Sequence, residues 1–259
     1  MISKPVLHLI GLGSITQLTL AWLVSFGLVA EVVGGEQPKA QSKRGLEFIR
    51  VSKDGRQFVS AESGVEFKAW GFNYDHDAAG RLLEEYWTNE WDAVVGDFEE
   101  MKALGANTVR IHLQVSRFMQ SAQEANRRSL EQLARLVTLA QRTGLYLDVT
   151  GLGCYDKKDV PQWYNELNEG PRWEVQARFW EAVAQTCSHS PVVFCYDLMN
   201  EPVVTEDKKG RDWTPGAFGG RYFVQRLTLD FAGRLKSRLP RPGLINWWRR
   251  SESTIGGTW

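Results

Sequence analysis

Strand-like and helix-like segments alternate along most of this chain, and that alternation limits the folds it can adopt. Short apolar, β-branched runs at residues 67–74, 107–113, 145–153 and 192–199 predict strands. Amphipathic stretches with helical spacing lie between them, and residues 126–144 are the clearest. Strands that alternate with helices indicate a parallel sheet with right-handed crossovers. We therefore expect an α/β protein.

The expected helices carry their own end signals. Residues 90–105 place apolar side chains on one face, and Gly105 fits a C-terminal cap. That face consists of Val94, Phe98, Met101 and Leu104. Gly144 ends the second helix in the same way, and residues 173–187 form a third. Before all of these, Asp54-Gly55 between two short β-like runs predicts a hairpin, which we expect at the N-terminal end of the sheet.

Two parallel α/β architectures fit this order, an open doubly wound sheet and a barrel. The glycine pair of "GLGSIT" near the start has no strand before it and no acidic residue at the distance that a dinucleotide site needs. In either architecture, functional groups lie just beyond the carboxyl ends of the strands. Polar residues stand at each of those ends, which predicts a site there. They are Asn73, Tyr74, Asp75, Arg110, His112, Asp148, Thr150, Asn200 and Glu201.

Composition excludes several other classes of function. The chain has 31 Lys and Arg against 31 Asp and Glu, which argues against nucleic acid as a partner. Its three cysteines, Cys154, Cys187 and Cys195, have neither metal-ligand nor disulfide-framework spacing, so we expect no metal and no other cofactor. Of its 11 tryptophans, Trp163 suits either a sugar-stacking platform or simple helix packing.

Four segments together resemble glycoside hydrolase family 5, the cellulases and mannanases of the Asn-Glu-Pro clan, over residues 45–230. They are "GFNYD", "MKALGANTVRIHL", "LYLDVTG" and "DLMNEP". The resemblance implies a (β/α)8 TIM barrel, of which this chain would hold the first four βα units and an N-terminal hairpin. It also implies a hydrolase that cleaves the O-glycosidic bonds of a polysaccharide or oligosaccharide, a β-linked glucan or mannan, with retention.

The resemblance also suggests roles for individual residues. Glu201 matches the family's general acid/base, and Asn200 matches the Asn that binds a sugar hydroxyl. Arg110 matches the Arg that supports the nucleophile. We expect His112, Asn73, Tyr74 and Trp163 to bind substrate as well.

The chain departs from the family pattern in two places. Its third strand ends in "DVTGLG" where many members carry a His, so that hydrogen bond is missing or is supplied by His112. The family's nucleophile stands on the seventh strand, and we expect only four strands here. A non-catalytic carbohydrate-binding protein or pseudoenzyme is therefore the alternative function. A membrane-anchored surface protein with a structural role is another. For Glu201 itself, the alternative interpretation is a helix-capping residue in a turn.

The last residues, 235–259, change character. They combine two prolines with Trp247-Trp248 and Arg249-Arg250 and show no helical or strand period. Read one base earlier, the codons for this stretch permit "LVAAIRKHDRRHL", an amphipathic helix with a basic end. A disordered tail is the simplest structural interpretation of residues 235–259, but such tails are rarely rich in Trp. We therefore expect a frameshift here, which would leave the catalytic domain at residues 45–234 incomplete and inactive.

The N-terminus predicts export. Lys4 precedes an apolar run from Leu18 to Ala30, and small residues follow, as in a secretory signal. An uncleaved anchor that contacts the membrane through residues 6–30 is the alternative. We expect a signal or anchor at residues 1–35, a linker at 36–44, and a protein that is secreted or held in the cell envelope.

Overall fold

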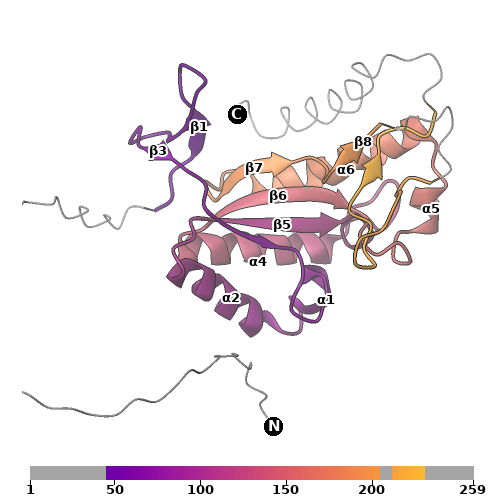
Figure 1. Ribbon diagram of the computed structural model, residues 1–259, viewed down its shortest axis with the longest axis horizontal. Coiled ribbons are helices and arrows are strands. Elements are labelled where there is room, and N and C mark those ends of the chain that lie inside the picture. The colour runs from indigo at the N-terminus through magenta and orange to yellow at the C-terminus, as the bar shows by residue number, and fades with distance from the viewer. Residues whose placement is uncertain (1–44, 205–211, 231–259) are drawn as a thin grey trace, which may run out of the picture. The chain divides into compact units, whose positions relative to one another are not determined.

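A computed structural model of the protein describes residues 45–204 and 212–230 (Figure 1). The expected signal or anchor, the linker and the aberrant tail lie outside these described residues. Within the described part of the chain, no helix is long and apolar enough to cross a membrane.

The centre of the molecule is a sheet of four parallel strands in sequential order, β4-β5-β6-β7. The strands are β4 (Gly71–Tyr74), β5 (Thr108–Gln114), β6 (Tyr146–Gly153) and β7 (Val193–Asp197). A doubly wound sheet reverses its order after the first strand, whereas a barrel adds each strand to the same edge. The observed order is that of four consecutive strands of a (β/α)8 barrel, as expected.

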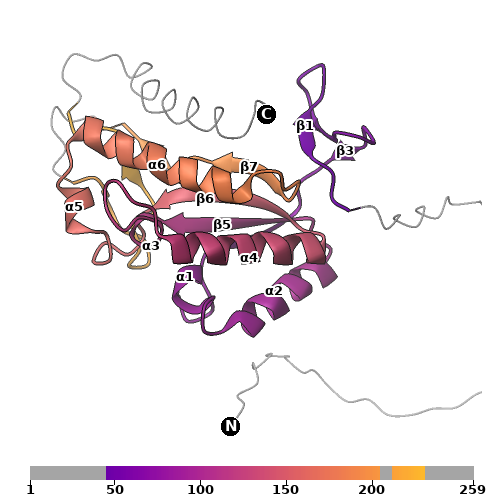
Figure 2. The same ribbon diagram turned by 180° about the vertical axis from the view of Figure 1, so that it is seen from behind.

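Three long helices alternate with these strands and cover one face of the sheet, which Figure 2 shows from the helix side. They are α2 (Trp91–Ala103), α4 (Arg127–Thr143) and α6 (Glu169–Cys187), and neighbouring helices contact one another. Short helices occupy the strand–helix connections: α1 (Leu83–Tyr86), α3 (Val115–Phe118) and α5 (Gln162–Asn165). Beyond β7, two-residue strands β8 (Pro202–Val203) and β9 (Gln225–Arg226) pair in parallel.

Helix α4 shows how local sequence sets an element's bounds. The Asn126 side chain accepts a hydrogen bond from the backbone N–H of Arg128, which caps the helix at its start. Gly144 ends it with a φ of 73°, a left-handed conformation that glycine adopts without steric cost. Both ends lie where the sequence predicts them. Helix α6 begins four residues earlier than predicted, at Glu169.

The N-terminal segment forms a three-stranded antiparallel sheet, β1 (Ile49–Val51), β2 (Phe58–Ser60) and β3 (Glu66–Phe67). The predicted turn at Asp54-Gly55 joins its first two strands. Rings from this sheet pack on the starts of β6 and β7: Phe67 contacts Tyr146 at 4.9 Å, and Phe58 contacts Phe194 at 4.9 Å. The sheet therefore covers the N-terminal end of the parallel strands, as predicted.

The prediction of one strand over residues 67–74 is wrong. Phe67 belongs to the antiparallel sheet, and the parallel strand begins only at Gly71. A Cβ at position 71 would lie 1.6 Å from the carbonyl oxygen of Thr108, so only glycine lets β4 approach β5 here. Phe67 instead packs against the rings of Tyr146 on β6 and Phe194 on β7. The chain therefore bends between Phe67 and Gly71.

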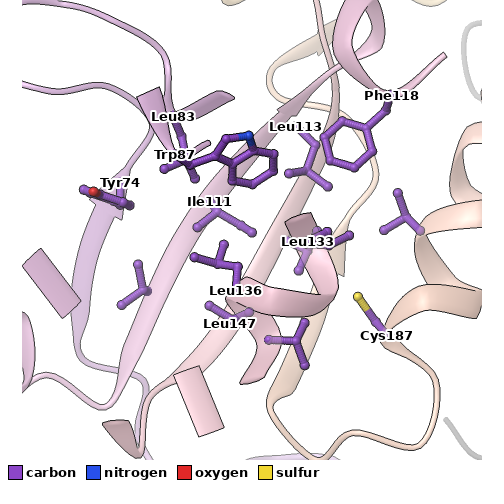
Figure 3. Packing of buried hydrophobic residues seen from close by; sticks show 14 of the residues in the cluster. Tyr74, Leu83, Trp87, Ile111, Leu113, Phe118, Leu133, Leu136, Leu147 and Cys187 are labelled. Carbon is purple, nitrogen blue, oxygen red and sulfur yellow. The ribbon is translucent and has the colours of Figure 1, made fainter. Parts of the chain in front are cut away.

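The apolar core lies between the helices and the outer face of the sheet (Figure 3). Ile111 and Leu113 of β5 point into it and meet Leu133 and Leu136 of α4, and all four are fully buried. The predicted face of α2 is confirmed for its first three apolar residues. Leu104, however, is 62% exposed, because α2 ends at Ala103 and the chain turns away.

Candidate active site

A pocket of about 580 Å³ lies at the carboxyl ends of the parallel strands. Residues from three strand ends and from the segment 215–224 line it, so the polar groups that the sequence places at β4, β5 and the end of β7 do converge. The lining residues are Asn73, Asp75, His76, Arg110, His112, Asn200, Glu201, Pro215, Gly216, Ala217, Phe218, Arg221, Phe223 and Val224.

Glu201 leaves the strand direction in an uncommon backbone conformation. Its φ of 42° is left-handed, a region that costs a residue with a side chain about 1 kcal/mol. Strain of this kind often accompanies a functional position. Glu201 is exposed, and it lines the pocket.

Arg110 organises the inner face of the sheet beneath Glu201. Its Nη2 donates to Oδ2 of Asp197 at 2.5 Å and to Oδ1 of Asn200 at 3.0 Å, and its Nε donates to the Thr150 hydroxyl at 2.8 Å. The Asn200 amide nitrogen donates in turn to the carbonyl oxygen of Phe223 at 3.0 Å. Both ends of the Asn200 amide are therefore held, and its orientation is defined.

Strand register explains this convergence. Arg110 lies beside Asp148 of β6, and Thr150 lies beside Asp197 of β7. The side chains alternate between the two faces of the sheet, so these polar residues share the face away from the helices. Burial raises the pKa of Asp148, whose Oδ2 lies 3.8 Å from Nε of Arg110.

His112 is buried beside the pocket and joins β4 to the segment after β6. Its Nε2 lies 2.6 Å from Oδ1 of Asn73, and its Nδ1 makes a short hydrogen bond with the hydroxyl of Tyr155. Burial lowers the pKa of His112 to about 4, so the ring is neutral at pH 7. Asn73 Nδ2 donates to Oδ1 of Asp75 at 3.1 Å, and Nδ1 of His76 lies 2.9 Å from the same oxygen.

Two residues that we expected to bind substrate lie elsewhere. The side chain of Tyr74 points into the core, where its hydroxyl donates to Asp97 at 2.5 Å and its ring meets Phe98. Trp163 is half-buried on α5, packs against the core and lies edge-on to Tyr164 at 5.7 Å. Neither lines the pocket. For both residues packing is the observed role, because each lies on the apolar side of its element.

The structure adds pocket residues that the sequence analysis did not assign. The first of them, His76, directly follows Asp75, which was predicted at the first strand end and also lines the pocket, so its position was the available signal. Arg221 and Phe218 come from the segment after the fourth strand, which has no periodic pattern. Arg221 donates to the carbonyl oxygen of Gly80 and thereby ties this segment to the loop after β4. Phe218 is 81% exposed.

Residues 45–204 and 212–230 contain no group of three or more His, Cys, Asp or Glu side chains arranged to hold a metal ion. The three cysteines are free thiols. Cys154 and Cys187 are buried, and Cys195 is half-buried.

Four parallel strands in sequential order, with an Asn-Glu pair after the fourth, are the features of the barrel family that the sequence resembles. The comparison with family models agrees. The model of the cellulase family, glycosyl hydrolase family 5, matches residues 60–219. The chain belongs to this family.

Several solved structures share the fold. A GH5_18 variant from Streptomyces cattleya in complex with Manβ1-4GlcNAc is 18% identical, with a TM-score of 0.52 over 72% of this chain and 43% of that chain. The exo-β-1,4-mannosidase Op5Man5 from Opitutaceae bacterium strain TAV5 is 17% identical, with a TM-score of 0.53 over 80% and 32%. A GH5_18 from Bifidobacterium longum subsp. infantis is 13% identical, with a TM-score of 0.51 over 73% and 42%.

These structures define the fold rather than a substrate, because their identity to the chain is low. The chain spans less than half the length of each of them. The comparison with curated proteins gave no significant match.

Proposed function

We propose that this protein takes part in the hydrolysis of β-linked glucan or mannan with retention, and that Glu201 is its general acid/base. One observation carries the proposal. Glu201 enters a pocket at the end of the fourth parallel strand, directly after Asn200, whose amide Arg110 holds in place. The sequence resemblance implies the acid/base at this position.

The geometry supports a two-step role for the carboxyl group. As an acid, Glu201 would protonate the glycosidic oxygen of the leaving group, and as a base it would then take a proton from the attacking water. Asn200 lies next to it with an oriented amide, which suits a hydrogen bond to a sugar hydroxyl. A bound sugar would exclude water from the pocket and strengthen each of these interactions.

Retention also needs a nucleophilic carboxylate about 5 Å from the acid/base. In the described part of the chain, Asp75 is the other carboxylate that lines the pocket, and Asn73 and His76 already hold it. The family places its nucleophile on the seventh strand, and the central sheet of the described residues has four strands, β4 to β7. We propose that the nucleophile lies outside the described residues.

Hydrolysis assays test this assignment. We expect the 259-residue polypeptide to turn over mannan, glucan and aryl β-glycosides slowly or not at all. A version that continues in the alternative reading frame to a full barrel should gain activity with retention of configuration. In that version, Glu201→Gln should slow turnover of substrates with poor leaving groups by about 100-fold or more. Aryl glycosides, whose leaving groups need little protonation, should be affected less at the first step.

Two results would contradict the proposal. Ordinary rates from the 259-residue polypeptide would show that this sequence already supplies a nucleophile, with Asp75 the first candidate among the described residues. An unchanged rate in the Glu201→Gln variant of the full barrel would remove Glu201 from the mechanism. Sequencing the gene downstream of codon 234 would test the frameshift itself.

A non-catalytic carbohydrate-binding role is the second candidate. The observation that favours it is Phe218, whose 81% exposed ring lies at a pocket rich in hydrogen-bonding groups. Exposed aromatic rings provide flat faces on which sugars stack. Sugar binding without turnover, even in the full-barrel version, would select this function.

We also propose that the protein is exported, on the sequence pattern of its first 35 residues. Mass spectrometry of the mature protein should find an N-terminus near Glu36. An intact Met1 on soluble cytosolic protein would refute export, and an intact Met1 on membrane-bound protein would indicate an uncleaved anchor.

A further inference from the structure

Five side chains beside the pocket form a continuous chain of hydrogen bonds that the role of Glu201 does not use. In order they are Tyr155, His112, Asn73, Asp75 and His76. All but Tyr155 line the pocket, and Tyr155 is fully buried behind them. Tyr155, His112 and Asp75 are buried, whereas Asn73 and His76 are exposed.

The direction of every hydrogen bond in this chain follows from its acidic member. The carboxylate of Asp75 can only accept, so the atom of Asn73 that faces it is the amide nitrogen. The amide oxygen of Asn73 therefore faces His112 and accepts from Nε2–H. In a neutral ring the other nitrogen then carries no hydrogen, so Nδ1 accepts from the hydroxyl of Tyr155.

The two carboxylate oxygens of Asp75 differ in their hydrogen bonds within the described part of the chain. Oδ1 accepts from Asn73 and from Nδ1 of His76. Oδ2 makes no hydrogen bond with the described part of the chain, although Asp75 lines the pocket. The His76 side chain is 54% exposed, and its Nε2 is the ring nitrogen that Asp75 does not hold. The pocket wall thus presents Oδ2 and Nε2 on two adjacent residues.

We propose that Asp75 and His76 form a binding site for the hydroxyl groups of a neutral pyranose, and that Tyr155 is the residue that positions it. The proposal rests on the proposed function for the class of ligand. A hydroxyl group donates and accepts, so it suits both Oδ2 of Asp75 and Nε2 of His76. An anionic sugar such as a uronic acid would bring a second negative charge to Asp75 and bind poorly.

Tyr155 acts at a distance of three hydrogen bonds. Its hydroxyl donates a hydrogen bond to Nδ1 of His112, so the ring hydrogen stays on Nε2. The amide oxygen of Asn73 then accepts from Nε2–H, and its amide nitrogen faces Asp75. Without the Tyr155 hydroxyl, the ring hydrogen of His112 can move from Nε2 to Nδ1. Nε2 would then be an acceptor, and it would compete with Asp75 for a hydrogen bond from the amide nitrogen of Asn73. Asp75 would lose the donor that holds its Oδ1.

Nitrogen NMR of the full chain labelled at histidine tests the positioning role without any need for turnover. In the wild type we expect His112 to be neutral at pH 7 with its hydrogen on Nε2. Tyr155→Phe keeps the ring and removes the hydroxyl, and we expect it to produce the other tautomer or a mixture. Tyr146→Phe is the matched control, because its hydroxyl donates to a backbone carbonyl at the opposite end of the strands.

Binding of methyl β-mannoside, methyl β-glucoside and methyl β-glucuronide to the full chain, measured by NMR titration, tests the site itself. We expect the two neutral glycosides to bind and the glucuronide to bind more weakly. Asp75→Asn should weaken neutral-glycoside binding about 10-fold, as the loss of a hydrogen bond to a charged group does. Tyr155→Phe should weaken it several-fold, and Asp92→Asn, which removes an exposed carboxylate of α2, should not.

The outcomes separate this proposal from the proposed function. A hydrogen on Nδ1 of His112 in the wild type would overturn the positioning role. Wild-type affinity in Asp75→Asn, glucuronide binding as tight as that of the neutral glycosides, or no binding of either neutral glycoside would overturn the site. Binding that depends on Asp75, in a full-barrel version that does not hydrolyse glycans, would leave this proposal standing and contradict only the enzymatic role.

Discussion

The two faces of strand β5 (Thr108–Gln114) carry side chains of opposite character. Toward the helices it presents Val109, Ile111 and Leu113, which are fully buried among apolar side chains. Toward the inner face it presents Arg110 and His112, which form hydrogen bonds with other strands and with the residues that follow them. Adjacent residues of one strand are therefore held by different interactions: apolar packing on one face and hydrogen bonds on the other.

The difference separates what maintains the fold from what forms the site. Apolar packing is non-directional and tolerates changes of side chain when volume is conserved. This agrees with a fold shared at 20% identity or less. Hydrogen bonds on the inner face depend on distance and angle, so a single atom out of place changes what the pocket can bind.

The largest expected effect comes from the outer face. Ile111→Ala removes a fully buried side chain between β5 and α4 and leaves a cavity. We expect the free energy of unfolding in urea to fall by about 2–5 kcal/mol.

Arg110→Met is the matched change one position away, on the inner face. It should cost about 1–3 kcal/mol, since Asp197 and Asn200 lose a donor but the apolar core is untouched. A larger loss from Arg110→Met than from Ile111→Ala would show that the inner network, and not the core, maintains the fold.

Glu84 on α1 sharpens the comparison, because its carboxylate is buried outside the pocket. Its Oε1 accepts from the backbone N–H of Gln114, and its Oε2 is buried without a partner. Burial raises the pKa of Glu84 from 4.5 to about 7. Between these pH values the folded protein keeps a proton that the unfolded chain releases, so the folded state loses stability as the pH rises from 4.5 to 7.

Glu84→Gln retains the acceptor and cannot ionise. We expect it to raise the free energy of unfolding by about 1–3 kcal/mol at pH 8 and to change it little at pH 4. Denaturation over that pH range measures the difference, with Glu99→Gln on the exposed side of α2 as the control. A gain of equal size at both pH values would mean that ionisation of Glu84 is not the cause.

The smallest expected effect comes from Glu201. Glycine adopts the left-handed conformation without strain but gains freedom in the unfolded chain, so Glu201→Gly should stabilise the fold by only about 0.5 kcal/mol. The same change should abolish the acid/base role in a full-barrel enzyme. His189→Gly, at another left-handed position, should stabilise the protein similarly without loss of activity. Destabilisation by Glu201→Gly would show that the Glu201 side chain contributes to folding.

Local signals were sufficient for most elements of the fold. The apolar spacing of residues 126–144 and Gly144 place α4 to within a residue at each end. They were insufficient where the position of a side chain depends on a contact with a residue far away in the sequence. Phe67 leaves the predicted strand for a ring contact with Tyr146, and Tyr74 turns into the core toward Asp97. No periodicity in residues 67–74 carries that information.

The sequence by itself determined that strands alternate with helices, and that an Asn-Glu pair follows the fourth strand. Both depend on neighbours within a few residues, so they can be read along the chain. Only the tertiary structure decided which polar groups meet. Tyr155 is 43 residues from His112, and Arg221 is 141 residues from Gly80, yet each pair is hydrogen-bonded. The register of the parallel strands and the path of the segment after β7 bring these atoms together, because hydrogen bonding acts only at contact distance.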